Sequence, residues 1–193
     1  MSDYDTDKYV KDADFVYSLA KGRMAESIFE ELFKKLGYMV ARSGQEVKFP
    51  EVMNSKGLPR NNPAYKTIKE LPDFIVHKGD FFYHFEIRYR TEEYLLFDKI
   101  SQMYLESTYY VLFSPKNIYC LNPEQIKNLL KSDGNKILFT QLLENCPDFN
   151  FKTEDYELVK AIRRMSVNLF VNLPVAKSMR NRVEQKTIKV PTG

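Results

Sequence analysis

The chain has 193 residues, of which 44% are hydrophobic and 28% are charged, and its formal net charge is +3. This length and apolar content suit one globular domain with a complete core, and no internal repeat or low-complexity segment is present. No apolar stretch reaches 18 residues and the N-terminus is acidic. We therefore expect neither a membrane span nor a secretory signal.

Cysteine content and charge distribution suggest where the protein acts. Cys120 and Cys146 lack the spacing of a metal site, so we expect free thiols in a reducing, cytoplasmic compartment. Over residues 160–193 basic side chains dominate and Glu184 is the only acid. A basic tail on an acidic body is compatible with a polyanionic partner, and equally with a solvated terminus.

The first elements follow from hydrophobic periodicity. Apolar residues at three- and four-residue steps predict a helix over residues 14–36, which Gly22 could divide and Gly37 is suited to end. Residues 38–42 form a short strand candidate. Residues 43–70 are rich in Pro, Gly and Asn, so we expect a long loop before the next strand.

Two apolar, β-rich runs over residues 71–76 and 81–90 are separated by a turn that contains Gly79. This pattern predicts an antiparallel hairpin. Side chains alternate across a strand. The alternation predicts one face with His84, Glu86 and Arg88 and the opposite, core-facing side with Phe85, Ile87 and Tyr89.

The hairpin would bring two acidic side chains together. Asp73 stands at the start of the first strand and can approach Glu86 across the hairpin. Two carboxylates that converge on one place repel each other unless a cation or a proton intervenes. The alternatives are local roles: Asp73 as a turn or helix cap, and Glu86 in an ion pair with Arg88 or Arg90.

The remaining sequence predicts further helices and strands, which alternate around a mixed sheet.

We expect one domain over residues 1–165 and a basic extension or arm over residues 166–193. The apolar run 169–173 is a possible interface for a homodimer. In chain order we expect a helix over 92–107, strands over 109–113 and 118–121, a helix over 122–131 with Asn122 as its cap, an edge strand or helix at 137–139, and a helix over 153–164.

This order of elements and one short motif carry a resemblance. The motif is Pro72-Asp73, then twelve residues, then Glu86-Ile87-Arg88 on the second strand of the hairpin. It resembles the core motif of the PD-(D/E)XK nuclease superfamily, and the likeness covers roughly residues 15–130. It implies a restriction-endonuclease-like α/β fold and hydrolysis of phosphodiester bonds, most often in DNA.

The resemblance also implies a set of site residues. Asp73, Glu86 and the carbonyl of Ile87 correspond to ligands of Mg²⁺ or Mn²⁺, hard cations that prefer oxygen. Glu26 is similar to the acid on the superfamily's first helix. Gln102 is similar to a glutamine that some branches place on the helix after the hairpin.

One position departs from the superfamily's pattern, because Arg88 stands where its motif has lysine. Arginine stays protonated and cannot act as a base. Arg88 could stabilise negative charge on the phosphate, or Lys99 on the next helix could take the place of the lysine. The third interpretation is a protein that has lost catalysis and still binds nucleic acid or a protein partner.

Overall fold

The computed structural model describes residues 3–43, 63, 70–100, 105–131 and 135–172, and it confirms the expected α/β fold. A five-stranded mixed sheet with the order β1-β2-β3-β5-β6 forms its centre. Its β3 and β5 run parallel, and the other neighbouring pairs are antiparallel. The strands are β1 (Met39–Arg42), β2 (Phe74–Lys78), β3 (Phe81–Tyr89), β5 (Thr108–Phe113) and β6 (Ile118–Leu121).

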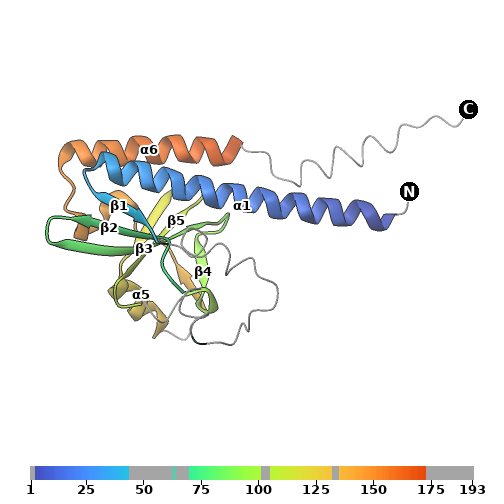
Figure 1. Cartoon of the computed structure of the whole chain (residues 1–193), viewed down its shortest axis with the longest axis horizontal. Coiled ribbons are helices and arrows are strands. Elements are labelled where there is room, and N and C mark those ends of the chain that lie inside the picture. Colours follow the sequence, from blue (N-terminus) through green and yellow to red (C-terminus); the bar gives the residue numbers. More distant parts are fainter. Residues whose placement is uncertain (1–2, 44–62, 64–69, 101–104, 132–134, 173–193) are drawn as a thin grey trace, which may run out of the picture.

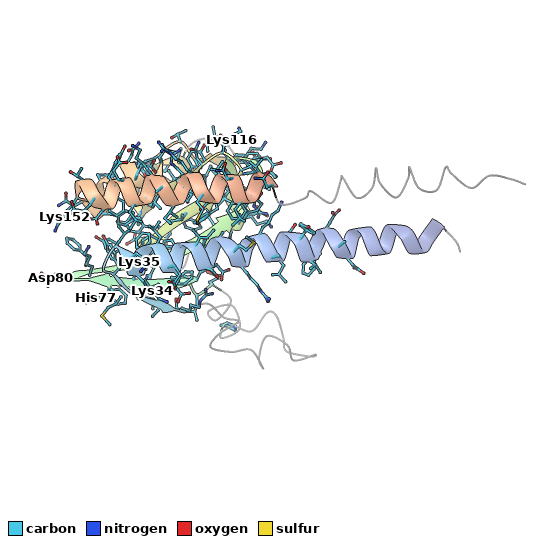
Figure 2. The ribbon with its side chains drawn as sticks, turned by 90° about the horizontal axis from the view of Figure 1, so that it is seen from above. Lys34, Lys35, His77, Asp80, Lys116 and Lys152 are labelled. Atoms are coloured by element: carbon cyan, nitrogen blue, oxygen red, sulfur yellow. The ribbon has the colours of Figure 1, made fainter. Side chains whose placement is uncertain are left out.

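Two long helices cover one face of the sheet. They are α1 (Asp3–Lys35) and α6 (Thr153–Asn172), which lie side by side, and the N-terminal part of α1 extends beyond the sheet (Figure 1, Figure 2). The core beneath them is largely aromatic. Phe29 and Phe33 of α1 pack on Phe74 and Phe85 of the sheet, and all four side chains are fully buried.

A second, smaller core lies on the opposite face, over β5 and β6. It is covered by α5 (Pro123–Leu130) and by a two-stranded sheet of β4 (Tyr94–Leu96) and β7 (Lys136–Leu138). Asn122 caps α5 as expected, because its side chain accepts a hydrogen bond from the backbone of Gln125. The Glu86 face of β3 is on this side of the sheet, next to Tyr110 and Leu112.

Helix α1 is longer than expected and continuous through Gly22. It ends where expected: Gly37 has a φ of 80°, and its N–H donates to the carbonyl of Lys34. The N–H of Tyr38 donates to the carbonyl of Phe33, which completes a Schellman motif. The chain reverses there and enters β1.

The hairpin of β2 and β3 is confirmed. Phe74 pairs with Phe85 and Lys78 with Phe81, so that Gly79 and Asp80 form a two-residue turn. Gly79 takes a φ of 60°, a conformation that glycine adopts without steric cost. Figure 2 shows His77 and Asp80 at this end of the hairpin, near the C-terminal end of α1 marked by Lys34 and Lys35.

The helix expected over residues 92–107 is wrong in its described part. Residues 94–96 form β4, and Phe97–Lys99 form one turn of 3₁₀ helix. Leu95 lies opposite Ile137 of β7, and both side chains are buried in the second core. Pairing with a strand about 40 residues away overrides the helical spacing of the apolar residues.

The C-terminal helix α6 continues to Asn172, past the expected end at Arg164. Phe170 is buried against Tyr89 and Phe113, whereas Leu169 and Val171 are exposed. The division into a domain and an extension at residue 165 stays a prediction.

Among the described residues, no helix is long and apolar enough to cross a membrane.

The aromatic core gives a test of how the candidate strand is held. We expect Phe85→Ala to lower the free energy of unfolding by about 3–5 kcal/mol, because a fully buried ring between α1 and the sheet leaves a cavity. Phe81→Ala on the same strand, where the ring is 61% exposed, is the matched control, with an expected change within about 0.5 kcal/mol. Urea denaturation measures both; equal losses would contradict this account of the core.

Candidate functional site

The hairpin brings the two predicted carboxylates together. Asp73 directly precedes β2, and the pairing of Phe74 with Phe85 sets it level with Glu86 on β3. The Oδ2 atom of Asp73 accepts a hydrogen bond of 2.8 Å from the backbone N–H of Ile87. The backbone carbonyl of Asp73 accepts another of 2.9 Å from Ser43, which follows β1. Three strands therefore fix the position of Asp73.

The guanidinium of Arg88 links the two acids. It forms an ion pair with Glu86, lies 3.7 Å from Oδ2 of Asp73, and donates a hydrogen bond of 3.3 Å to the carbonyl of Ile87. The side chains of Asp73, Glu86 and Arg88 are 22%, 14% and 38% exposed. The site is thus half-buried, and Arg88 is the most exposed of its three side chains.

The electrostatics reflect this partial burial. Burial raises the pKa of Glu86 to about 8, with a further contribution from Asp73, while Arg88 acts in the opposite direction. Burial disfavours the charge of Arg88, but attraction to Glu86 and Asp73 outweighs it and raises the pKa of the guanidinium. Asp73 and Glu86 therefore share one positive group, the guanidinium of Arg88.

The oxygens of Asp73, Glu86 and Ile87 fit a hard divalent cation by their chemistry. They are two carboxylates and one backbone carbonyl that already converge on a cationic group. Within the described ranges, no group of three or more His, Cys, Asp or Glu side chains could hold a metal ion. The donor set therefore depends on the backbone carbonyl as well as on the two acids.

Glu26 pairs with a different arginine from the one that links Asp73 and Glu86. Its carboxylate contacts Arg42 of β1 at 3.1 Å, and Arg42 also binds Glu30 at 2.7 Å. Glu26 still contributes weakly to the raised pKa of Arg88. Sequence reasoning missed Arg42. The sequence shows Arg42 only as a basic residue at the end of a short strand candidate. Its ion pairs with Glu26 and Glu30 become evident only from the way β1 lies against α1.

The structure describes one of the two residues expected after the hairpin. Lys99 is in the 3₁₀ turn and pairs with its neighbour Asp98 at 3.0 Å. Gln102 lies outside the described residues. The role of each stays a prediction.

His84 occupies the same strand face as Glu86, two residues earlier. Its Nδ1 atom shares a hydrogen bond of 2.8 Å with the hydroxyl of Ser107, and burial lowers the pKa of the imidazole. Ser107 directly precedes β5, so this bond connects β3 to the start of the neighbouring parallel strand.

Comparison with known proteins gives a similarity in structure. No protein-family model matches the chain, and no curated protein matches it. The chain is similar in structure to Hjc, a Holliday junction resolvase from the archaeal hyperthermophile Archaeoglobus fulgidus. The two are 17% identical, with a TM-score of 0.39 over 61% of this chain and 88% of that chain.

The raised pKa of Glu86 predicts a pH-dependent stability in EDTA. The folded state retains a proton that the unfolded chain releases above the ordinary value of 4.5. The free energy of unfolding should therefore fall as pH rises from 4.5 to about 8, by at most about 1.4 kcal/mol per pH unit from this group. Glu86→Gln should flatten this dependence.

Urea denaturation at several pH values in this window measures the effect. Glu157→Gln, an exposed position on α6, is the control and should follow the wild type. A Glu86→Gln profile parallel to that of the wild type would show that Glu86 titrates normally.

Proposed function

We propose that the chain is a metal-dependent nuclease that hydrolyses phosphodiester bonds in DNA. The observation that carries the proposal is the convergence of Asp73, Glu86 and the carbonyl of Ile87 on one cationic group. Together with Arg88, the two acids leave one net negative charge when both are ionised. A divalent cation would balance that charge more fully than the guanidinium alone.

The residues divide the work in this proposal. Asp73, Glu86 and the Ile87 carbonyl would hold Mg²⁺ or Mn²⁺, which supplies charge compensation and an activated water. Asp73 is already oriented by the N–H of Ile87. Arg88, the most exposed of the three side chains, suits neutralisation of the phosphate in the transition state. Because Arg88 stays protonated, it is not a general base.

A second candidate is a catalytically inactive protein that retains the fold and binds nucleic acid. The contacts of Arg88 favour it, because the guanidinium satisfies the same three oxygens that a metal would use. The two candidates differ in whether a divalent ion can displace those contacts. DNA as the partner, a homodimer and a cytoplasmic location are part of the proposal in both cases.

The metal ligands give the first functional prediction. Asp73→Asn and Glu86→Gln should abolish Mn²⁺ binding in calorimetry and cleavage of supercoiled plasmid, because each removes an anionic ligand. Asp80→Asn, at the exposed turn of the hairpin, is the control and should behave as the wild type. If Mn²⁺ binds the Asp73→Asn and Glu86→Gln variants as tightly as the wild type, the metal site lies elsewhere.

Arg88 gives the second prediction. In Arg88→Ala, Mn²⁺ should bind about tenfold more tightly or better, because the competing guanidinium is gone. Cleavage should nevertheless fall, since the phosphate loses its partner, and Arg88→Lys should retain part of it. Unchanged Mn²⁺ affinity in Arg88→Ala would contradict competition for the same oxygens. If neither the wild type nor Arg88→Lys cleaves DNA with Mg²⁺ or Mn²⁺, while both still bind DNA, the result would support the catalytically inactive candidate.

A further inference from the structure

One part of the central sheet presents uncharged side chains to solvent. It is on the face opposite α1, over β1, β2 and the first half of β3. The residues share exposed or half-buried side chains and lack a fixed charge. We name them the open sheet face: Met39, Ala41, Ile75, His77, Phe82 and His84.

Strand register places these side chains in two adjacent rows. Met39, His77 and Phe82 are opposite one another across the three strands, and so are Ala41, Ile75 and His84. Met39 is 73% exposed and Phe82 is 59% exposed, so β1 and β3 each present one large apolar side chain to solvent on this face. The ring of Phe82 meets the edge of His84, with centroids 5.7 Å apart.

The open sheet face is continuous with the candidate site. Phe82, His84 and Glu86 alternate along β3, so they point to the same side of the sheet. Four residues of extended strand separate Phe82 from Glu86, a distance of about 13 Å. A nucleic-acid strand with a phosphate at Glu86 could therefore reach Phe82 within a few nucleotides.

We propose that the open sheet face, centred on Phe82, stacks an unpaired base of the DNA strand whose phosphodiester lies at Asp73 and Glu86. This inference rests on the proposed function and assigns its substrate class: DNA that is single-stranded, or splayed apart, next to the cut. Aromatic side chains bind bases through their π faces without regard to sequence.

The chemistry of the surface favours a base over the other occupants. The outside of a duplex presents phosphates, which need cations, and none of the six side chains has a fixed positive charge. A second copy of the chain would need about 20–30 residues on each side for a stable interface, several times this surface. An unpaired base is small, flat and uncharged. It therefore matches a surface of six residues that has no fixed charge.

Phe81 and Phe82 provide a matched pair of variants. Their side chains are 61% and 59% exposed, but they point to opposite faces of β3, and Phe81 stacks on Tyr83 instead. The experiment measures binding of labelled oligodeoxythymidylate by fluorescence anisotropy, with the full chain in EDTA. Since EDTA removes divalent ions, the result does not depend on metal binding or cleavage.

We expect Phe82→Ala to weaken binding of the oligonucleotide by about five- to a hundredfold, the loss typical of one stacked base. Phe81→Ala should change it less than about twofold, and neither variant should alter binding of a blunt duplex. An oligonucleotide in which every position is abasic offers no base to stack, and it should bind the wild type and Phe82→Ala with equal affinity. Circular dichroism and thermal melting confirm that both variants fold.

Several results would overturn the proposal. They are equal losses in the two variants, no loss in either, the absence of binding by the wild type, or a change of oligomeric state in Phe82→Ala alone. Failure of the nuclease proposal is separate: it appears as unchanged Mn²⁺ binding or cleavage in Asp73→Asn, whatever Phe82→Ala does to the oligonucleotide.

Discussion

The contact of one guanidinium with two carboxylates is the constraint on which the candidate site depends. Asp73 and Glu86 are brought together by the register of the β2–β3 hairpin, and both are largely removed from water. Like charges in such a place repel strongly, and burial adds a desolvation cost for each. Arg88 offsets both effects in part, and the raised pKa of Glu86 shows that the offset is incomplete.

The architecture around this contact explains why it can persist. Behind the hairpin, the aromatic core of Phe29, Phe33, Phe74 and Phe85 fixes the strands against α1. In front of it, the described residues of the second core pack on β5 and β6. The acids therefore lie at a border between a packed region and the open sheet face. This arrangement lets a rigid scaffold present charged groups to a ligand.

The sequence predicted those parts that depend on local rules. The hairpin, its turn at Gly79, the end of α1 at Gly37 and the cap at Asn122 all follow from residue alternation or from backbone preferences. It did not predict β4, because that strand exists only by pairing with β7 far along the chain. Likewise, the contacts of Arg42 with Glu26 and Glu30 depend on how β1 lies against α1.

The candidate site divides in the same way. The approach of Asp73 to Glu86 was predictable, since period-two alternation and the turn length decide it. That Arg88 reaches Asp73, Glu86 and the carbonyl of Ile87 together was not, because a long side chain has many rotamers and its choice depends on local charge. The sequence therefore indicated which groups meet, and the structure indicated what now balances them.

The central claim is that these oxygens form a cation site which Arg88 shares with a divalent ion. The most direct measurement is anomalous diffraction from crystals soaked in Mn²⁺ above pH 8, where Glu86 is ionised. The account predicts a manganese peak within coordination distance of Asp73, Glu86 and the carbonyl of Ile87, with the guanidinium of Arg88 moved away. Manganese bound elsewhere, or Arg88 unmoved in its contacts with the site empty, would contradict it.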